Sequence, residues 1–241
     1  MTMIPDMSVR SSEKEIMDDY SGPVADLRQN LAELEIINRY LGGHKALTSA
    51  FDKLLDDGIL YRDGSFTVAD LGSGAGDNLR AVADWAETKG IHLTLVGIDY
   101  NQTMIDYAAE RCRDYPSVSL QRQDVLSEEF ADGSYDVVMC SLFCHHFTDG
   151  QLERLFSNIR RCTTRAFIIN DLHRHWLAWY GIRLLTTLFS RSRLVKHDGP
   201  LSVRRAFKRE ELMALLNGAG HNQVLIHWIF AFRFRSISYL S

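Results

Sequence analysis

The stretch Val68-Ala69-Asp70-Leu71-Gly72-Ser73-Gly74-Ala75-Gly76-Asp77-Asn78 decides the fold prediction. It starts as an apolar run and ends in three glycines spaced by single residues, and residues 79–86 then favour a helix. A strand, a tight turn and the start of a helix follow one another in this order in nucleotide-binding α/β folds. We therefore predict that the turn binds a nucleotide.

The residues around the glycines restrict the kind of nucleotide. Gly72 and Gly74 begin a dinucleotide fingerprint, but Asp77 stands where the third glycine is needed, and its carboxylate would repel a pyrophosphate. A Walker loop is excluded because no Gly-Lys-Ser/Thr follows. S-adenosylmethionine has a sulfonium and an amino group but no phosphate, so it suits this turn better.

Asp70-x-Gly72-x-Gly74-x-Gly76 has the spacing of motif I in class I S-adenosylmethionine-dependent methyltransferases, and the chain resembles that family from about residue 66 onward. The resemblance implies an α/β fold with a Rossmann-like seven-stranded sheet, mostly parallel with an antiparallel last strand. It also implies an N-terminal helical cap over residues 1–60, a methyltransferase domain over residues 61–241, and a lid insert after strand five at residues 172–206.

Composition limits the partners. The chain has 241 residues, 46% of them hydrophobic, and a formal net charge of -4 with acids and bases interspersed, so we expect no nucleic-acid partner. No apolar run is long enough to span a bilayer. The four cysteines lie in ordinary segments and no signal peptide is recognisable, which favours reduced thiols in the cytoplasm. The sequence permits a homodimer.

Two helices are predicted before the motif. Residues 1–25 read as a loosely structured lead-in, residues 26–41 as an amphipathic helix that ends at Gly42-Gly43, and residues 44–56 as a second helix. In the family such helices often cover the cofactor, so Tyr20 and Arg39 are candidates to face it. The alternative for Arg39 is a solvated position on the helix.

Three predicted strands, at residues 66–71, 93–98 and 118–123, are each associated with an acid at the carboxyl end: Asp70, Asp99 and Asp124. These ends meet in the crevice where open α/β sheets bind ligands. We predict that Asp99 accepts hydrogen bonds from the ribose hydroxyls, because a carboxylate has two acceptor oxygens for a cis-diol. Its alternative role as a helix N-cap can be taken by Asn101.

The resemblance also implies that Asp124 binds the adenine amino group. Tyr100 and Met104 would flank the adenine, with core packing as the alternative. Together, the residues predicted to bind the cofactor are Asp70, Gly72, Ser73, Gly74, Gly76, Asn78, Asp99, Tyr100, Met104, Asp124, Val125, Cys140 and Arg39.

The fourth strand, predicted at residues 135–140, begins with Ser134-Tyr135-Asp136-Val137-Val138, which is similar to the family's usual entry to this strand. Cys144-His145-His146-Phe147 follows where amino-group and nucleic-acid methyltransferases often carry an Asn/Asp-Pro-Pro-Tyr/Phe box. The box is absent, and the His-His-Phe loop instead resembles small-molecule methyltransferases.

A histidine in this loop is the predicted general base. A phenol or enol is mostly protonated at neutral pH, and histidine supplies a base of suitable pKa. We favour His146 over His145; alternatively, one of them packs in the crevice wall and the other caps the next helix. His173 and His175 are rival bases after strand five.

We expect no metal. Cys140, Cys144 and the two histidines are suitable zinc ligands, but no Cys-x-x-Cys pair is present. Magnesium-dependent catechol-type methyltransferases carry an Asp at the end of strand four and an Asp-Asn pair after strand five. Here strand four ends on Cys140-Ser141 and the later pair is reversed, as Asn170-Asp171.

The lid insert is rich in aromatic and basic residues, and such a lining suits a planar or acyl-bearing acceptor. The alternative is that its apolar residues form one packed helix face, namely Trp176, Trp179, Leu184, Leu185 and Leu188. A helix at residues 208–217 and a strand pair at residues 221–239 complete the predicted fold.

The predicted activity is S-adenosylmethionine-dependent methylation of a small molecule, at an oxygen of a phenolic or polyketide-like compound. Residues 38–43, 171–174 and 198–205 diffusely resemble methyltransferases that accompany type III polyketide synthases. The alternatives are carbon methylation of a quinone precursor and a cofactor-binding module without catalysis.

Overall fold

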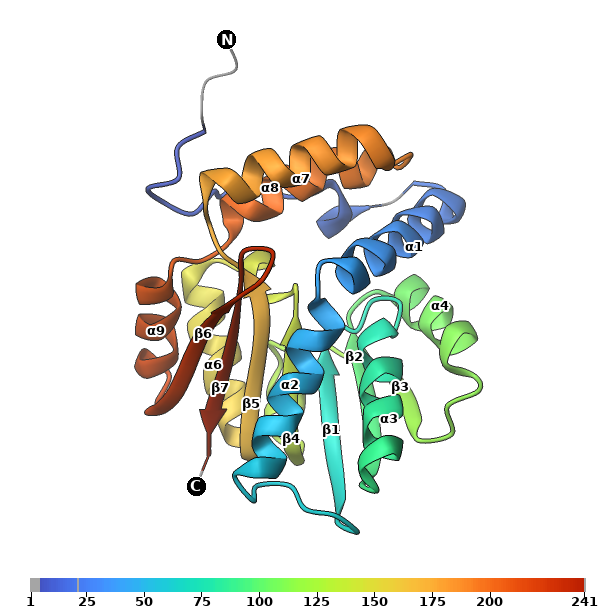
Figure 1. Ribbon diagram of the computed structural model, residues 1–241, viewed down its shortest axis with the longest axis vertical. Helices are drawn as coiled ribbons and strands as arrows, with labels where there is room; N and C mark the ends of the chain where they lie inside the picture. Colours follow the sequence, from blue (N-terminus) through green and yellow to red (C-terminus); the bar gives the residue numbers. More distant parts are fainter. Residues whose placement is uncertain (1–4, 21, 241) are drawn as a thin grey trace.

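The computed structural model describes residues 5–20 and 22–240 (Figure 1). Its centre is a seven-stranded sheet in the order β3-β2-β1-β4-β5-β7-β6. β7 is antiparallel to β5 and β6, while β1 to β5 pair in parallel, which confirms the predicted sheet. The strands are β1 (Ser65–Leu71), β2 (His92–Asp99), β3 (Val118–Arg122), β4 (Tyr135–Ser141), β5 (Thr163–Leu172), β6 (Gln223–Ile229) and β7 (Arg233–Tyr239).

Helices cover both faces of the sheet (Figure 1). α2 and α3 share one hydrophobic core with the sheet, and α6 and α9 share the other. α7 and α8 lie across the carboxyl ends of the parallel strands. The helices are η1 (Ile16–Asp19), α1 (Val24–Tyr40), α2 (Gly43–Asp56), α3 (Asp77–Lys89), α4 (Gln102–Cys112), α5 (Glu128–Ala131), η2 (Cys144–His146), α6 (Asp149–Cys162), α7 (Trp176–Phe189), α8 (Arg193–Arg205) and α9 (Arg209–Gly218).

Local sequence signals explain where several helices begin. The Asn101 side chain accepts a hydrogen bond from the Thr103 amide (2.9 Å) and caps α4, which leaves Asp99 free for another role. Thr148 and Gln151 form a capping box at the start of α6. The chain passes directly from α6 into β5, which begins at Thr163.

The N-terminal 60 residues are not a separate layer. In α2, Leu47, Phe51 and Leu54 are fully buried in the same core as Val68 of β1, so this helix is part of the sheet's packing. Residues 5–20 are held by specific contacts; Arg10, for example, donates to the Phe147 carbonyl (2.9 Å). Residues 5–15 form no helix or strand, as predicted for the lead-in, but these contacts fix the segment in place.

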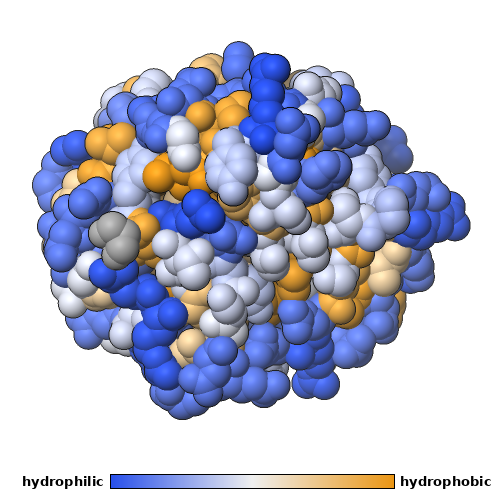
Figure 2. Space-filling model, turned by 90° about the horizontal axis from the view of Figure 1, so that it is seen from below, coloured by the Kyte–Doolittle hydropathy of each residue, from blue (hydrophilic) through white to orange (hydrophobic). Residues whose placement is uncertain are grey.

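The lid insert forms α7 and α8. In α7, Trp179 is buried, but Trp176, Leu184 and Leu188 are exposed, so the five apolar residues do not form one packed face. In the described part of the chain, no helix combines the length and the apolar character that a bilayer span requires. Figure 2 shows the opposite end of the molecule, which is largely hydrophilic with small scattered apolar areas.

Gly72, the first glycine of the motif, allows the geometry of the turn to be tested. Gly72 has φ +68° and a Cβ there would overlap the Phe143 ring, whereas Gly90 has the same φ with open space around it. We expect Gly90→Ala to lower the free energy of unfolding by about 1 kcal/mol, and Gly72→Ala to lower it by about 2 kcal/mol more. Chemical denaturation of both variants measures the difference, and equal losses would contradict the close approach of Phe143.

Candidate functional site

The glycine-rich turn is fixed to the end of β2 by backbone hydrogen bonds. The amides of Gly72 and Ser73 both donate to the Ile98 carbonyl (2.8 and 3.1 Å), and the Gly74 amide donates to Asp99 Oδ2 (3.2 Å). Gly76, at φ +70°, precedes the first residue of α3. A cavity of about 330 Å³ opens beside this turn. It is lined by Gly72, Ile98, Asp99, Tyr100, Gln123, Asp124, Val125, Phe143 and Phe147.

Asp99 forms part of the cavity wall, as a ribose ligand should. Its second oxygen, Oδ1, accepts the Asn101 amide (2.9 Å), and burial raises the pKa of the carboxyl group. Each carboxylate oxygen has a further lone pair for a ligand hydroxyl. Tyr100, Asp124 and Val125 line the same cavity, so four of the predicted cofactor residues from β2 and β3 come together here.

Two further predicted residues are buried without hydrogen-bond partners. Both carboxylate oxygens of Asp70 and the Ser73 hydroxyl have none, and burial raises the pKa of Asp70 well above its usual value. Buried polar groups of this kind are costly unless a ligand satisfies them. The predicted cofactor carries a positively charged amino group, and such a group fits these atoms.

Two predicted cofactor residues lie in cores and not on the cavity. Met104 packs with Leu27 and Leu31 of α1 in a small apolar cluster, which agrees with the core-packing alternative. Cys140 is fully buried in the core that α6 and α9 share with the sheet. Side chains alternate along a strand, so the side chain of Cys140 faces away from that of its neighbour Ser141.

The predicted role of Arg39 is not supported, because the side chain is exposed. Its neighbour Asn38 is buried and donates to Asp77 Oδ2 (3.1 Å) and to Asn78 Oδ1 (3.3 Å). His44 Nε2 also contacts Asp77 Oδ2 (2.7 Å). Asn78 and Asp77 therefore hold α1 and α2 against the start of α3.

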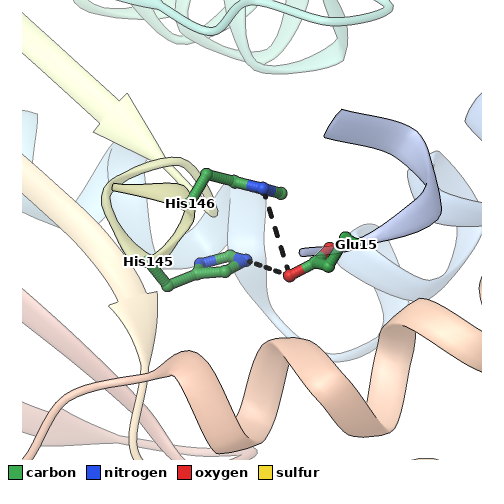
Figure 3. A group of neighbouring side chains, drawn as sticks. All are labelled: Glu15, His145 and His146. Carbon is green, nitrogen blue, oxygen red and sulfur yellow. Dashed lines mark ion pairs between the residues drawn. The ribbon is translucent and has the colours of Figure 1, made fainter. Parts of the chain in front are cut away.

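The histidine pair lies in the turn after β4 (Figure 3), and each histidine has its own carboxylate. His145 Nδ1 is 2.7 Å from Asp171 Oδ1, and its amide donates to Asp171 Oδ2 (3.2 Å). His146 Nδ1 is 2.6 Å from Asp18 Oδ1. A carboxylate on one ring nitrogen fixes the ring and leaves the other nitrogen available.

Glu15 is a third member of this group that sequence reasoning missed. It comes from the N-terminal segment, and its Oε1 lies 3.6 Å from His145 Nε2 and 4.0 Å from His146 Nδ1 (Figure 3). This buried oxygen has no hydrogen-bond partner, and burial raises the pKa of Glu15 to about 7. No motif marks residue 15, which stands in a polar stretch far from the histidines in sequence.

Two residues of α8 hold the N-terminal segment over the histidines. Arg205 donates to Asp18 Oδ2 (2.7 Å) and to the His145 carbonyl (3.1 Å). Asp198 accepts the amides of Ile16 (2.9 Å) and Met17 (3.0 Å). The lid and the N-terminal segment therefore close over the histidine pair together.

The group can carry a proton or hold a metal ion. The ligand atoms of Glu15, His145 and His146 lie within 4.8 Å of one another. However, Arg205 Nε is 3.8 Å from the same Glu15 oxygen, and Asp18 already occupies His146 Nδ1. A cation at that point would meet the guanidinium charge, so the arrangement favours proton transfer.

The rival histidines after β5 have structural partners. His175 Nδ1 accepts the Leu177 amide (3.1 Å) and caps α7. His173 lies 4.7 Å from the Phe234 ring, centroid to centroid, and burial lowers its pKa. His145 and His146 are better placed for chemistry.

Comparisons with known proteins agree with this fold. Residues 68–165 match the family model of a methyltransferase domain. Magnesium protoporphyrin IX methyltransferase from Synechocystis PCC 6803, solved with bound S-adenosylmethionine, is 15% identical with a TM-score of 0.60 over 94% of this chain and 95% of its own. The search of curated proteins found no relative.

Two other solved structures share the fold over 73% of this chain, each with a TM-score of 0.55. One is an O-methyltransferase family protein from Burkholderia thailandensis, 20% identical and covered over 51% of its length. The other is the CurJ carbon methyltransferase, 15% identical and covered over 49%. This chain thus spans about half the length of these two proteins.

The raised pKa of Glu15 predicts a pH dependence of stability. Its folded pKa of about 7 exceeds the ordinary value of 4.5, so its contribution is complete below about pH 4.5 and is lost as the pH rises through 7. Between about pH 5 and pH 8, the wild type should lose up to about 3 kcal/mol of unfolding free energy relative to Glu15→Gln. Denaturant unfolding at both pH values measures this, and parallel pH profiles would contradict the burial of a titrating Glu15.

Proposed function

We propose that this chain is a class I S-adenosylmethionine-dependent methyltransferase that methylates an oxygen of a phenolic or polyketide-like small molecule, with a histidine as general base. The observation that carries the proposal is the histidine pair, in which each ring is held by its own carboxylate. A neutral base beside the cofactor cavity suits an acceptor that must lose a proton before it attacks.

The cofactor residues divide into two groups. Asp99 holds the ribose, and Tyr100, Asp124 and Val125 form the wall for the adenine. Asp70, which is buried without a hydrogen-bond partner, faces the amino group. When bound, the cofactor supplies a methyl group on a sulfonium, so the protein's task is to orient the acceptor and remove its proton.

We assign the base role to His146. About a quarter of its side chain is exposed, against 3% for His145, and the next residue, Phe147, lines the cavity beside the glycine-rich turn. Asp18 holds Nδ1, so Nε2 is the nitrogen that accepts the acceptor's proton. The pKa of Asp18 is lowered to about 2, because bonds from His146 and Arg205 outweigh its partial burial, and it therefore stays charged.

His145 lies next to this base and is itself held by Asp171. The two imidazole rings lie 4.3 Å apart, and Asp171 is fully buried with a lowered pKa: burial opposes ionisation, but the bond to His145 outweighs it. Phe143 and Phe147, in edge contact at 4.9 Å, add an aromatic wall beside the turn. Such a wall suits a planar acceptor.

Carbon methylation of a quinone precursor is the second candidate. It uses the same base, because a phenolate also directs its ring carbon toward an electrophile, and the fold is shared with a carbon methyltransferase. Mass spectrometry with a methyl-labelled cofactor and a panel of phenols separates the two. A label that resists ether cleavage assigns the methyl group to carbon and would overturn the oxygen assignment.

The ribose role of Asp99 predicts a loss of cofactor affinity. Asp99→Ala should weaken S-adenosylhomocysteine binding by about 100-fold, because two charge-assisted hydrogen bonds are lost. Calorimetry measures the affinity, and Asp106→Ala on the exposed face of α4 is the control. Unchanged affinity in Asp99→Ala would remove the ribose role.

The base role of His146 predicts a pH-dependent loss of turnover. His146→Ala should lower kcat about 100-fold near neutral pH. The loss should shrink toward about pH 10, where a phenol ionises without help. The pH profile of labelled methyl transfer measures this, with the exposed His227→Ala as control. A loss that is the same at every pH would indicate a positional role instead.

A further inference from the structure

Four adjacent strands place one polar residue each at the same edge of the sheet. Val68, Met139, Ile168 and Ile237 all belong to the core under α2 and α3. Side chains alternate along a strand, so residues an even number of positions away share that face. At the carboxyl ends of β1, β4 and β5 and the start of β7, these are Asp70, Ser141, Asn170 and Arg233, which we call the polar row.

The polar row is buried and largely unsatisfied. All four residues are less than 9% exposed, and Asn170 Nδ2 donates to Ser141 Oγ (2.8 Å). Both Asp70 oxygens, Asn170 Oδ1, and Nε and Nη1 of Arg233 have no hydrogen-bond partner. An interior with five such atoms is unfavourable by itself, so the row is suited to a ligand that supplies the missing partners.

Arg233 is the member of the polar row whose burial is least favourable. Its side chain is 2% exposed, and burial lowers its pKa to about 10, while Asp171 and Asp77 oppose this effect. The guanidinium therefore stays charged at neutral pH and needs an anion close by. The hairpin turn before it, on the lid side of the sheet (Figure 1), holds Ala231 and Phe232 at φ +63° and +53°. Positive φ at neighbouring residues is usual in a tight β-hairpin turn, and this turn fixes where β7 begins at Arg233.

The position of Arg233 assigns the anion to the acceptor and not to the cofactor. Arg233 stands three strands from Asp70, a backbone separation of about 14 Å. In the amino-acid part of the cofactor, the ammonium and carboxylate groups are attached to the same carbon. Both groups therefore lie near Asp70 when the cofactor binds there. Arg233 begins β7 opposite Leu172 of β5, and the residue before Leu172 is Asp171, the carboxylate that bonds to His145. The guanidinium thus belongs to the half of the site that holds the base.

We propose that Arg233 binds a carboxylate of the methyl acceptor, so that the substrate is a hydroxylated aromatic or polyketide-derived carboxylic acid. This inference rests on the proposed function, because it places the acceptor hydroxyl at the histidine pair. The acid group at Arg233 and the hydroxyl at His146 hold the acceptor at two points, and Asn170 provides a further polar contact between them.

The test is calorimetry on the protein loaded with S-adenosylhomocysteine. The probes are protocatechuate, a dihydroxylated benzoate, and its neutral methyl ester, which differ only in the free carboxylate. Wild type should bind the acid at least about tenfold more tightly than the ester. Arg233→Met should abolish the preference. Arg235→Met, which changes a residue of the same strand and face that bonds to Ser49, should keep it.

Several results would overturn the proposal: equal affinities for acid and ester in wild type, no binding of either probe, or a preference that survives Arg233→Met. A tenfold loss of S-adenosylhomocysteine affinity in Arg233→Met would assign the guanidinium to the cofactor and also overturn it. Because these are binding measurements, an acid preference without methyl transfer to any phenol would count against the proposed His146 chemistry alone.

Thermal unfolding separates a ligand role from a structural one. Replacing a buried unpaired charge with an apolar side chain of similar length often stabilises a protein. The melting temperature of Arg233→Met should therefore equal or exceed that of the wild type. A melting temperature several degrees lower would mean that Arg233 maintains the fold, and the proposal would fail.

Discussion

The bonds between the glycine-rich turn and the end of β2 determine where everything else in the site can lie. Two amides of the turn share the Ile98 carbonyl, and a third reaches the Asp99 carboxylate. These bonds place the cavity between β1, β2 and β3, and they leave the Asp70 carboxylate buried without a partner. The backbone thus provides the shape of the cavity, and in the proposed function the buried Asp70 carboxyl group receives the amino group of the cofactor.

The second half of the site depends on contacts between distant segments. The proposed base, His146, is on the turn after β4, its carboxylate is on the N-terminal segment, and the arginine that bonds to this carboxylate is on α8. None of these three segments can form the site alone. The sheet therefore supports the cofactor half, whereas the lid and the N-terminal segment complete the acceptor half.

Sequence patterns predicted the first half well and the second half poorly. Period-two and helical patterns gave the sheet and most helices, and the spacing of the glycines and of the strand-terminal acids gave the cavity residues. Glu15 and Asp18 were missed because they lie in a polar segment whose position is fixed only by Arg205 and Asp198. Arg233 was missed because a charged residue at the start of a strand is usually solvated.

Cys140 and Arg39 were predicted to bind the cofactor, but tertiary packing turns their side chains elsewhere. Cys140 precedes the strand end by one position, and that single step turns its side chain into the core. Arg39 and Asn38 are neighbours on α1, yet only Asn38 faces α3. Spacing along the chain identifies the right segment, and the face is decided by packing.

The N-terminal segment has a kinetic consequence. It lies over the histidines through many polar contacts, including those of Arg10 with the Phe147 carbonyl and of Asp198 with two amides. Each contact of this kind contributes modestly, and local segments can open without global unfolding. In the proposed reaction, opening of this segment would widen the path of the acceptor and of the methylated product. The pace of the catalytic cycle would then depend on this opening as well as on the transfer of the methyl group.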